Sequence, residues 1–125
     1  MKLVDGNNQV IGYFFFPLTA ALQVGDDTVF TGLDIYNRTF SSEGPTFYYA
    51  SGDCSGPALM YVNLSRYGWV NKGTLHFPQG VVTEQPFNSY SYDADCSPFP
   101  GGFGPLASAG QADVSSFVGP FSVKQ

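Results

Sequence analysis

Apolar positions recur in short runs along this chain, and clusters of Gly, Asp, Asn and Pro separate the runs. In one run, Val29, Thr31, Leu33 and Ile35 occupy every second position. A period of two places successive side chains on opposite faces of an extended backbone. The pattern therefore predicts a series of short β-strands joined by tight turns.

Two β-hairpins are predicted near the N-terminus. In residues 2–16, two apolar arms flank Asp5-Gly6-Asn7-Asn8, and in residues 20–36 two further arms flank Gly25-Asp26-Asp27. Gly, Asn and Asp tolerate the positive φ angles that tight hairpin turns require.

The rest of the chain follows the same logic. We expect one strand in 45–51, two short strands in 58–70, two strands around Pro78-Gln79-Gly80 in 73–92, a long Pro/Gly-rich surface loop in 97–113 and a final strand in 121–124. These elements predict a single β domain over residues 1–125. Its architecture would be all-β, an antiparallel β-sandwich or partly open barrel of the jelly-roll or immunoglobulin-like kind.

Composition and charge narrow the function classes. Aromatic residues make up 17% of the chain, charged residues only 12%, and the net charge is −5. The five basic residues are scattered, so nucleic acid and anionic membranes are not expected as partners. The most apolar segment, residues 10–22, is too short to span a bilayer and contains Pro17, so membrane insertion is not expected. We expect no cofactor and no metal, because the cysteines and the one histidine lack ligand spacing.

One motif looks catalytic at first. Residues 51–57, Ser-Gly-Asp-Cys-Ser-Gly-Pro, look like the nucleophile loop of a chymotrypsin-like protease with Cys54 in the place of serine. A thiol nucleophile needs a histidine base. The only histidine, His76, follows Cys54, whereas in that loop the histidine precedes the nucleophile. No catalytic residue is therefore assigned, and we do not expect an enzyme.

Cys96 offers Cys54 a different role. Both cysteines stand in an Asp-Cys-Ser sequence, with a proline two or three residues later, and the chain has no others. Two such cysteines in an aromatic β domain predict one Cys54–Cys96 disulfide. A disulfide indicates an extracellular or cell-surface protein whose export signal is not in this numbering. A phage particle protein would need no such signal.

The chain also resembles a recurrent β-rich domain of predicted secreted bacterial proteins, some of which have collagen-like or phage-tail-like stretches. The likeness is carried by the opening "LVDGNNQVIG", by "DCSGP" at 53–57 with the later Cys96, and by "FVGPFSV" at 117–123. The resemblance implies an extracellular, disulfide-bonded β module without catalytic residues.

Some polar and aromatic residues are candidates for sugar chemistry. Asn37 and Asn63 fit the N-glycosylation pattern, although turn residues often fit it by chance. Tyr67, Trp69, Tyr90 and Tyr92 are candidate glycan-stacking residues. Aromatic residues on strands more often pack in the core or against a neighbouring strand.

Two functions remain from this reading. The first is a non-enzymatic extracellular structural module that assembles with copies of itself into a surface appendage, fibre or filament by pairing strands between subunits. The alternative is a glycan-binding or adhesive tip module of a bacterial or phage surface protein. Equally, both terminal strands could simply pair within their own sheet.

Overall fold

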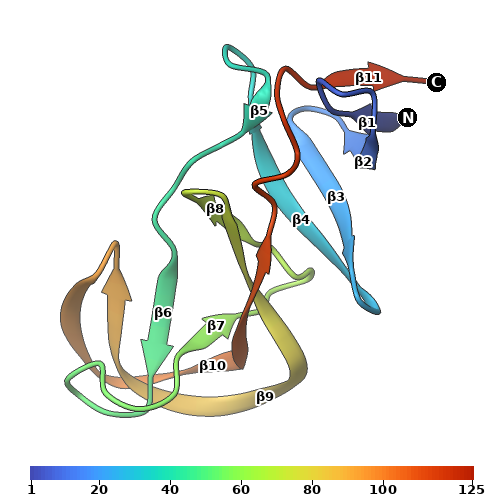
Figure 1. Ribbon diagram of the computed structural model, residues 1–125. Helices are drawn as coiled ribbons and strands as arrows, with labels where there is room; N and C mark the ends of the chain where they lie inside the picture. The colour runs from blue at the N-terminus through green and yellow to red at the C-terminus, as the bar shows by residue number, and fades with distance from the viewer.

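The computed structural model describes residues 1–125 and is built from β-strands alone, as predicted (Figure 1). The strands are β1 (Lys2–Val4), β2 (Val10–Phe15), β3 (Thr19–Val24), β4 (Asp27–Asp34), β5 (Thr39–Phe40), β6 (Thr46–Tyr49), β7 (Leu59–Tyr61), β8 (Trp69–Asn71), β9 (Thr74–Tyr92), β10 (Asp95–Asp113) and β11 (Ser122–Lys124). They form two antiparallel sheets, which agrees with a sandwich or partly open barrel. No helix has the length and hydrophobicity needed to traverse a bilayer.

The first sheet has the strand order β11-β1-β2-β3-β4-β5 and contains both termini (Figure 1). Both predicted hairpins are confirmed, as β1 pairs with β2 and β3 pairs with β4. The pairing of Val24 with Asp27 leaves Gly25 and Asp26 as the turn, and Gly25 has a φ of 60°. The predicted C-terminal strand is β11, and it pairs with β1.

The two ends of the first sheet approach one another. The backbone N–H of Phe121, just before β11, donates to the carbonyl of Arg38, just before β5, over 2.6 Å. The Arg38 Nε returns a hydrogen bond of 3.1 Å to the carbonyl of Phe121. The sheet therefore curls into a partly open barrel, whose two ends meet at these contacts before β11 and β5 and are not otherwise paired.

The second sheet is organised by one long hairpin. β9 and β10 have 19 residues each and pair along their lengths, from Asp95–Tyr92 to Asp113–Thr74. β8 and β6 pair with β9, β7 pairs with β10, and β6 pairs with β7. The strands β6, β7, β10 and β9 thus form a closed ring of pairings.

The prediction of a surface loop in 97–113 is wrong, because these residues lie within β10. Likewise, the two strands expected in 73–92 are the single strand β9. Irregularities in the β9–β10 register, between Pro98 and Gly102 and between Leu106 and Ser108, accommodate residues that would interrupt a regular ladder. Proline and glycine are tolerated in strands at such bulges. The high density of proline and glycine in this segment therefore reflects bulges in a paired strand and not a surface loop.

The first sheet and the base of the long hairpin share one hydrophobic core. From the first sheet and its C-terminal connection come Leu3, Ile11, Ala20, Leu22, Val29, Phe40, Val114 and Phe121, and from β8 and β9 come Val70, Leu75 and Phe77. The buried Thr31 hydroxyl donates to the Gly68 carbonyl over 2.9 Å, and Phe30 forms a bridge with Tyr67. These contacts attach the region around β8 to β4.

The predicted disulfide joins Cys54 to Cys96, with the two Cα atoms 6.1 Å apart. It anchors the loop between β6 and β7 to β10. The same loop is also held by Ser89, which accepts a hydrogen bond from the Cys54 backbone N–H and donates to the Ser51 carbonyl. The disulfide indicates an oxidising, non-cytoplasmic environment.

A buried carboxylate joins the two ends of the chain. Asp5 is only 3% exposed, and it accepts backbone hydrogen bonds from Asn7, Gln9 and Val118. Burial raises the pKa of Asp5, but the N–H groups of Gln9, Val118 and Asn7 together hold it below its ordinary value. Asp5 thus holds the β1–β2 turn against the segment that leads into β11.

Removing the disulfide tests its contribution to stability. Replacement of Cys54 and Cys96 together by serine should lower the free energy of unfolding by about 4 kcal/mol, because the 42-residue separation gives a long unfolded loop. Urea denaturation of the oxidised protein and the double variant measures the difference. Equal midpoints would show that the cross-link does not stabilise the fold.

The substitution Asp5→Asn should lower the melting temperature at neutral pH, because an amide oxygen replaces an anionic acceptor of three backbone N–H groups. A carboxyl whose folded pKa is lowered stabilises the protein above the unfolded pKa, and this effect is lost as pH falls through the folded pKa. The deficit of the variant should therefore shrink on acidification below about pH 4. Thermal melts from neutral to acidic pH test this, with the exposed Asp26→Asn as control; a deficit independent of pH would contradict it.

Candidate functional site

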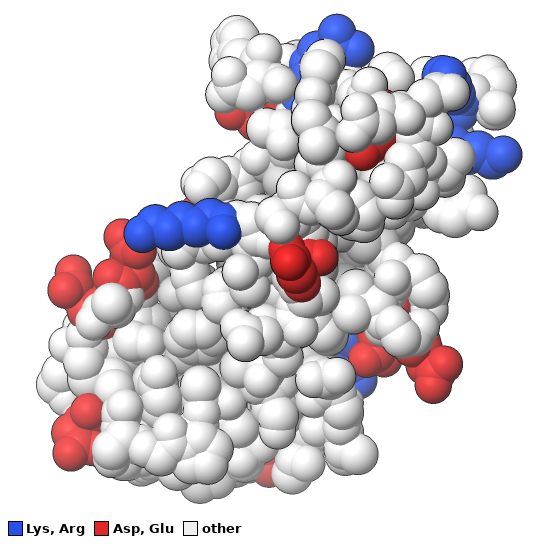
Figure 2. Space-filling model, in the orientation of Figure 1, with Lys and Arg blue, Asp and Glu red and all other residues white.

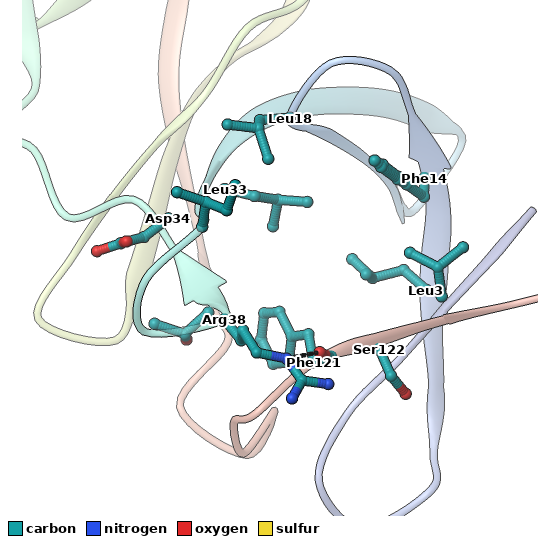
Figure 3. Close-up of a pocket in the computed structure, with 11 residues that line it drawn as sticks. Leu3, Phe14, Leu18, Leu33, Asp34, Arg38, Phe121 and Ser122 are labelled. Atoms are coloured by element: carbon teal, nitrogen blue, oxygen red, sulfur yellow. Dashed lines mark hydrogen bonds between the residues drawn. The ribbon is translucent and has the colours of Figure 1, made fainter.

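An apolar hollow opens at the mouth of the first-sheet barrel (Figure 3). It has a volume of about 140 Å³. Its apolar walls come from β1, β2 and β4, from the turns next to them and from the start of β11, and they consist of Leu3, Phe14, Leu18, Leu33, Ile35, Phe121 and Val123. The labelled apolar side chains surround an open centre in Figure 3.

The hollow follows from the topology of the barrel. The β8–β9 end of the second sheet supplies the core on one side, through residues such as Leu75 and Phe77. Neither residue lines the hollow, whose walls come only from the first sheet and its turns. The barrel interior is thus covered by the second sheet at one end and open at the other.

Two charged residues beside the hollow form hydrogen bonds with the backbone that surrounds it. Arg38 is engaged with the Phe121 carbonyl. The Asp34 carboxylate accepts hydrogen bonds from the side-chain amide and backbone N–H of Asn37 and from the backbone N–H of Tyr36, and these bonds lower the pKa of Asp34. Both charges therefore stabilise the β4–β5 turn and the barrel closure, and the hollow itself is apolar.

Exposed apolar side chains surround the mouth of the hollow. Leu18, Ile35 and Val123 line the hollow and are also exposed to solvent. Phe16 and Tyr36, in the turns that flank it, are each 92% exposed. Exposed apolar groups gathered around an apolar concavity are typical of an interaction site.

The structure separates the four candidate glycan-stacking residues. Tyr67 and Trp69 lie together, with ring centroids 4.9 Å apart, where the second sheet meets β4. Tyr90 lies instead on the distal part of β9, against Tyr48 and Phe99. Tyr92 is exposed at the end of β9. The four residues therefore do not form one platform.

The remaining candidates are placed as follows. Asn37 and Asn63 are both exposed, and the Asn37 amide is bonded to Asp34. Cys54 is in the disulfide and has no free thiol. The His76 ring packs edge-on against Phe47, and burial lowers its pKa. No three His, Cys, Asp or Glu side chains are grouped as a metal site.

Charge plays little part on the visible surface. Figure 2 shows charged side chains as isolated groups separated by wide uncharged areas. Only five residues in 125 are Lys or Arg, and the blue groups in this view are few and lie mostly at the upper end. The interactions that this surface favours are therefore apolar and hydrogen-bonded contacts.

No protein-family model, curated protein or solved structure matches this chain.

Sequence reasoning missed the barrel-mouth hollow. Phe14 and Ile35 fall in the predicted hairpins and Leu18 falls between them, and no pattern in the sequence places the three together. One signal was available in residues 13–16, where four aromatic residues are consecutive. A strand with one buried face buries only every second side chain, so some of these rings must be exposed or line a concavity. Only the barrel closure at Arg38 and Phe121 shows that their neighbours line a concavity.

A small apolar probe tests whether the hollow is accessible. A cavity of roughly 150 Å³ lined by aliphatic and aromatic groups holds one benzene molecule. Benzene should therefore shift the methyl resonances of Leu3, Leu18 and Leu33 in a saturable way. The methyl resonances of Leu64, which is exposed and does not line the hollow, should stay unchanged. Leu18→Trp should weaken the effect. Uniform shifts across all methyl groups would show that the hollow does not bind apolar groups.

Proposed function

We propose that this protein is a non-enzymatic structural module that associates with copies of itself outside the cytoplasm through the mouth of the first-sheet barrel. The observation that carries the proposal is an apolar hollow of about 140 Å³ next to an aromatic side chain that is 92% exposed. The side chain is Phe16, and Phe14 and Leu18 on either side of it both line the hollow.

Size and chemistry make a phenyl ring a suitable occupant. The hollow has about the volume that accommodates one benzene ring. Burying a phenylalanine side chain contributes about 1.5–3 kcal/mol relative to leaving it in water. Phe16 is 92% exposed, so its ring is available to a neighbour.

The position of Phe16 favours a two-fold arrangement. In a two-fold contact the same patch serves both copies, so a residue that enters its partner's hollow is matched by the reciprocal insertion. Phe16 and the hollow lie at the same end of the molecule, as such a contact requires. Ile35, which lines the hollow, and Tyr36 in the neighbouring turn are both exposed and would add to the buried apolar area.

The terminal strands support association in a second way. β11 pairs only with β1, so its other edge has unpaired backbone groups. An exposed edge can accept a strand from another subunit. Pairing at this edge would extend a dimer into a fibre or filament of a surface appendage. Both β1 and β11 pair within their own sheet. Association at the β11 edge would therefore add a strand from the neighbouring subunit to the sheet, without an exchange of strands between subunits.

The substitution Phe16→Ser tests the proposed contact. The wild-type protein should show a monomer–dimer equilibrium in sedimentation velocity experiments, and Phe16→Ser should shift it to monomer, because the ring that fills the hollow is lost. Phe103→Ser is the matched control, since Phe103 is an exposed phenylalanine on β10. A wild-type protein that is monomeric at all accessible concentrations, or equal effects of the two variants, would refute the proposal.

A further inference from the structure

A second hollow lies on the ring of strands in the second sheet. It has a volume of about 280 Å³ and is lined by Thr46, Tyr48, Phe87, Tyr90 and Phe99. These residues come from β6, β9 and β10, and none of them is charged. The joined ends of β9 and β10 next to it lie far from the two termini in Figure 1.

Aromatic rings held at different angles form its walls. The Phe99 ring stacks on the buried Phe87 ring, with centroids 5.5 Å apart and planes inclined by 28°. Tyr90 meets Phe99 edge-on at 6.2 Å, and Tyr48 meets Phe87 edge-on at 4.8 Å. Phe99 is 49% exposed, so part of its ring is open to a ligand.

A β-bulge places Phe99 in this position. The register of β10 against β9 shifts between Pro98 and Gly102, so residues 99–101 project from the ladder. Gly101 has a φ of 79°, and its backbone N–H donates to the Asn88 side chain over 3.2 Å. A Cβ at position 102 would lie 2.3 Å from the Phe87 ring, so a larger residue there would displace that ring. Bulges commonly re-aim a side chain next to a functional site.

Two of the residues that line the hollow, Tyr48 and Tyr90, carry hydroxyl groups. Every buried side-chain nitrogen or oxygen has a hydrogen-bond partner within the protein. The hydroxyls of Tyr48 and Tyr90 have no such partner, so they are accessible to solvent. Burial, together with the nearby Tyr61 and Tyr90, raises the pKa of Tyr48, so its hydroxyl is a neutral donor. The Thr46 side chain adds a third hydroxyl to the lining.

We propose that this hollow binds one residue of a neutral carbohydrate. A pyranose ring has an apolar face of C–H groups, which can stack on the Phe99 ring, and hydroxyl groups at its edge, which can bond to Tyr48, Tyr90 and Thr46. The absence of charge in the lining disfavours phosphate, carboxylate and ammonium ligands, whose desolvation would not be compensated. This site is separate from the barrel mouth, and the proposal does not depend on self-association.

The size of the hollow favours a single sugar residue. Its volume is at the lower limit of ligand pockets, which run from about 300 to 1,000 Å³. The residue could be terminal or internal in a longer glycan, because the hollow is open to solvent. Among the four residues named from the sequence, only Tyr90 lines it.

Titration with neutral methyl glycosides tests the proposal. Methyl β-glucoside, methyl β-galactoside and methyl N-acetyl-β-glucosaminide should be added to isotopically labelled protein. At least one should shift the amide resonances of Tyr90 and residues 99–102 in a saturable way. Phe99→Ala should weaken this binding about tenfold through the lost stacking. Tyr90→Phe should weaken it about fivefold through the lost hydroxyl.

Phe103→Ala is the matched control, because Phe103 lies on the same strand and outside the hollow. It should bind as the wild type does, and the dispersion of each spectrum shows whether the variant is folded. The proposal is overturned if no glycoside produces saturable shifts or if Phe99→Ala and Tyr90→Phe, both folded, bind as well as the control. Shifts at the same amides with an oligoproline peptide but with no glycoside would also overturn it, because the hollow would then be a peptide site.

Discussion

The pairing of β9 with β10 is the constraint on which the rest of the structure depends. Each of β6, β7 and β8 is hydrogen-bonded to one of these two strands. The base of the hairpin contributes Leu75 and Phe77 to the core that it shares with the first sheet. Its far end contains the bulge at 99–101 and the disulfide at Cys96. A shift of one residue in this register would therefore disturb both the core and the aromatic hollow.

The barrel of the first sheet depends on contacts that are few and far apart in sequence. Its closure rests on the hydrogen bonds between Arg38 and Phe121. Asp5 fixes the position of the same C-terminal segment by accepting the N–H of Val118. These contacts join residues that are more than 80 positions apart, and bringing such residues together costs conformational entropy. The packing of Phe121 against Phe40 helps to offset this cost. The apolar hollow depends on this closure, because its lining includes Arg38 and Phe121 themselves.

The sequence predicted the fold class, the two N-terminal hairpins and the disulfide, because each has a local or compositional signal. Alternation around Val29 and the turn at Gly25 need no tertiary information. The segment 97–113 shows the limit of this reasoning. Its prolines and glycines predict a loop, yet Pro105 has its carbonyl bonded to the Val62 N–H and lies in a paired strand. A strand tolerates proline at a position where no neighbouring carbonyl needs a hydrogen bond from its backbone nitrogen. Which positions meet this condition depends on pairing with strands that are distant in the sequence.

The candidate sites were less predictable than the fold for a similar reason. The sequence marks Tyr90 as an aromatic residue on a predicted strand. Its partner Tyr48 lies about forty residues before it, and its partner Phe99 lies nine residues after it. Only the ring of pairings through β6, β9 and β10 brings the three together. A chain with alternating aromatic residues predicts that some will stack, and the topology decides which ones.

The two hollows lie on different sheets, and this separation has a consequence for function. A ring that enters the barrel mouth contacts β2, β4 and β11, none of which lines the aromatic hollow. Association of two copies through the mouth would therefore leave both aromatic hollows open. Two weak sugar sites on one particle bind a surface with many glycans more tightly than either site alone, because the second contact forms at a high effective concentration. The proposed self-association and the proposed sugar binding are therefore compatible, since self-association would strengthen the weak binding expected of a small, neutral hollow.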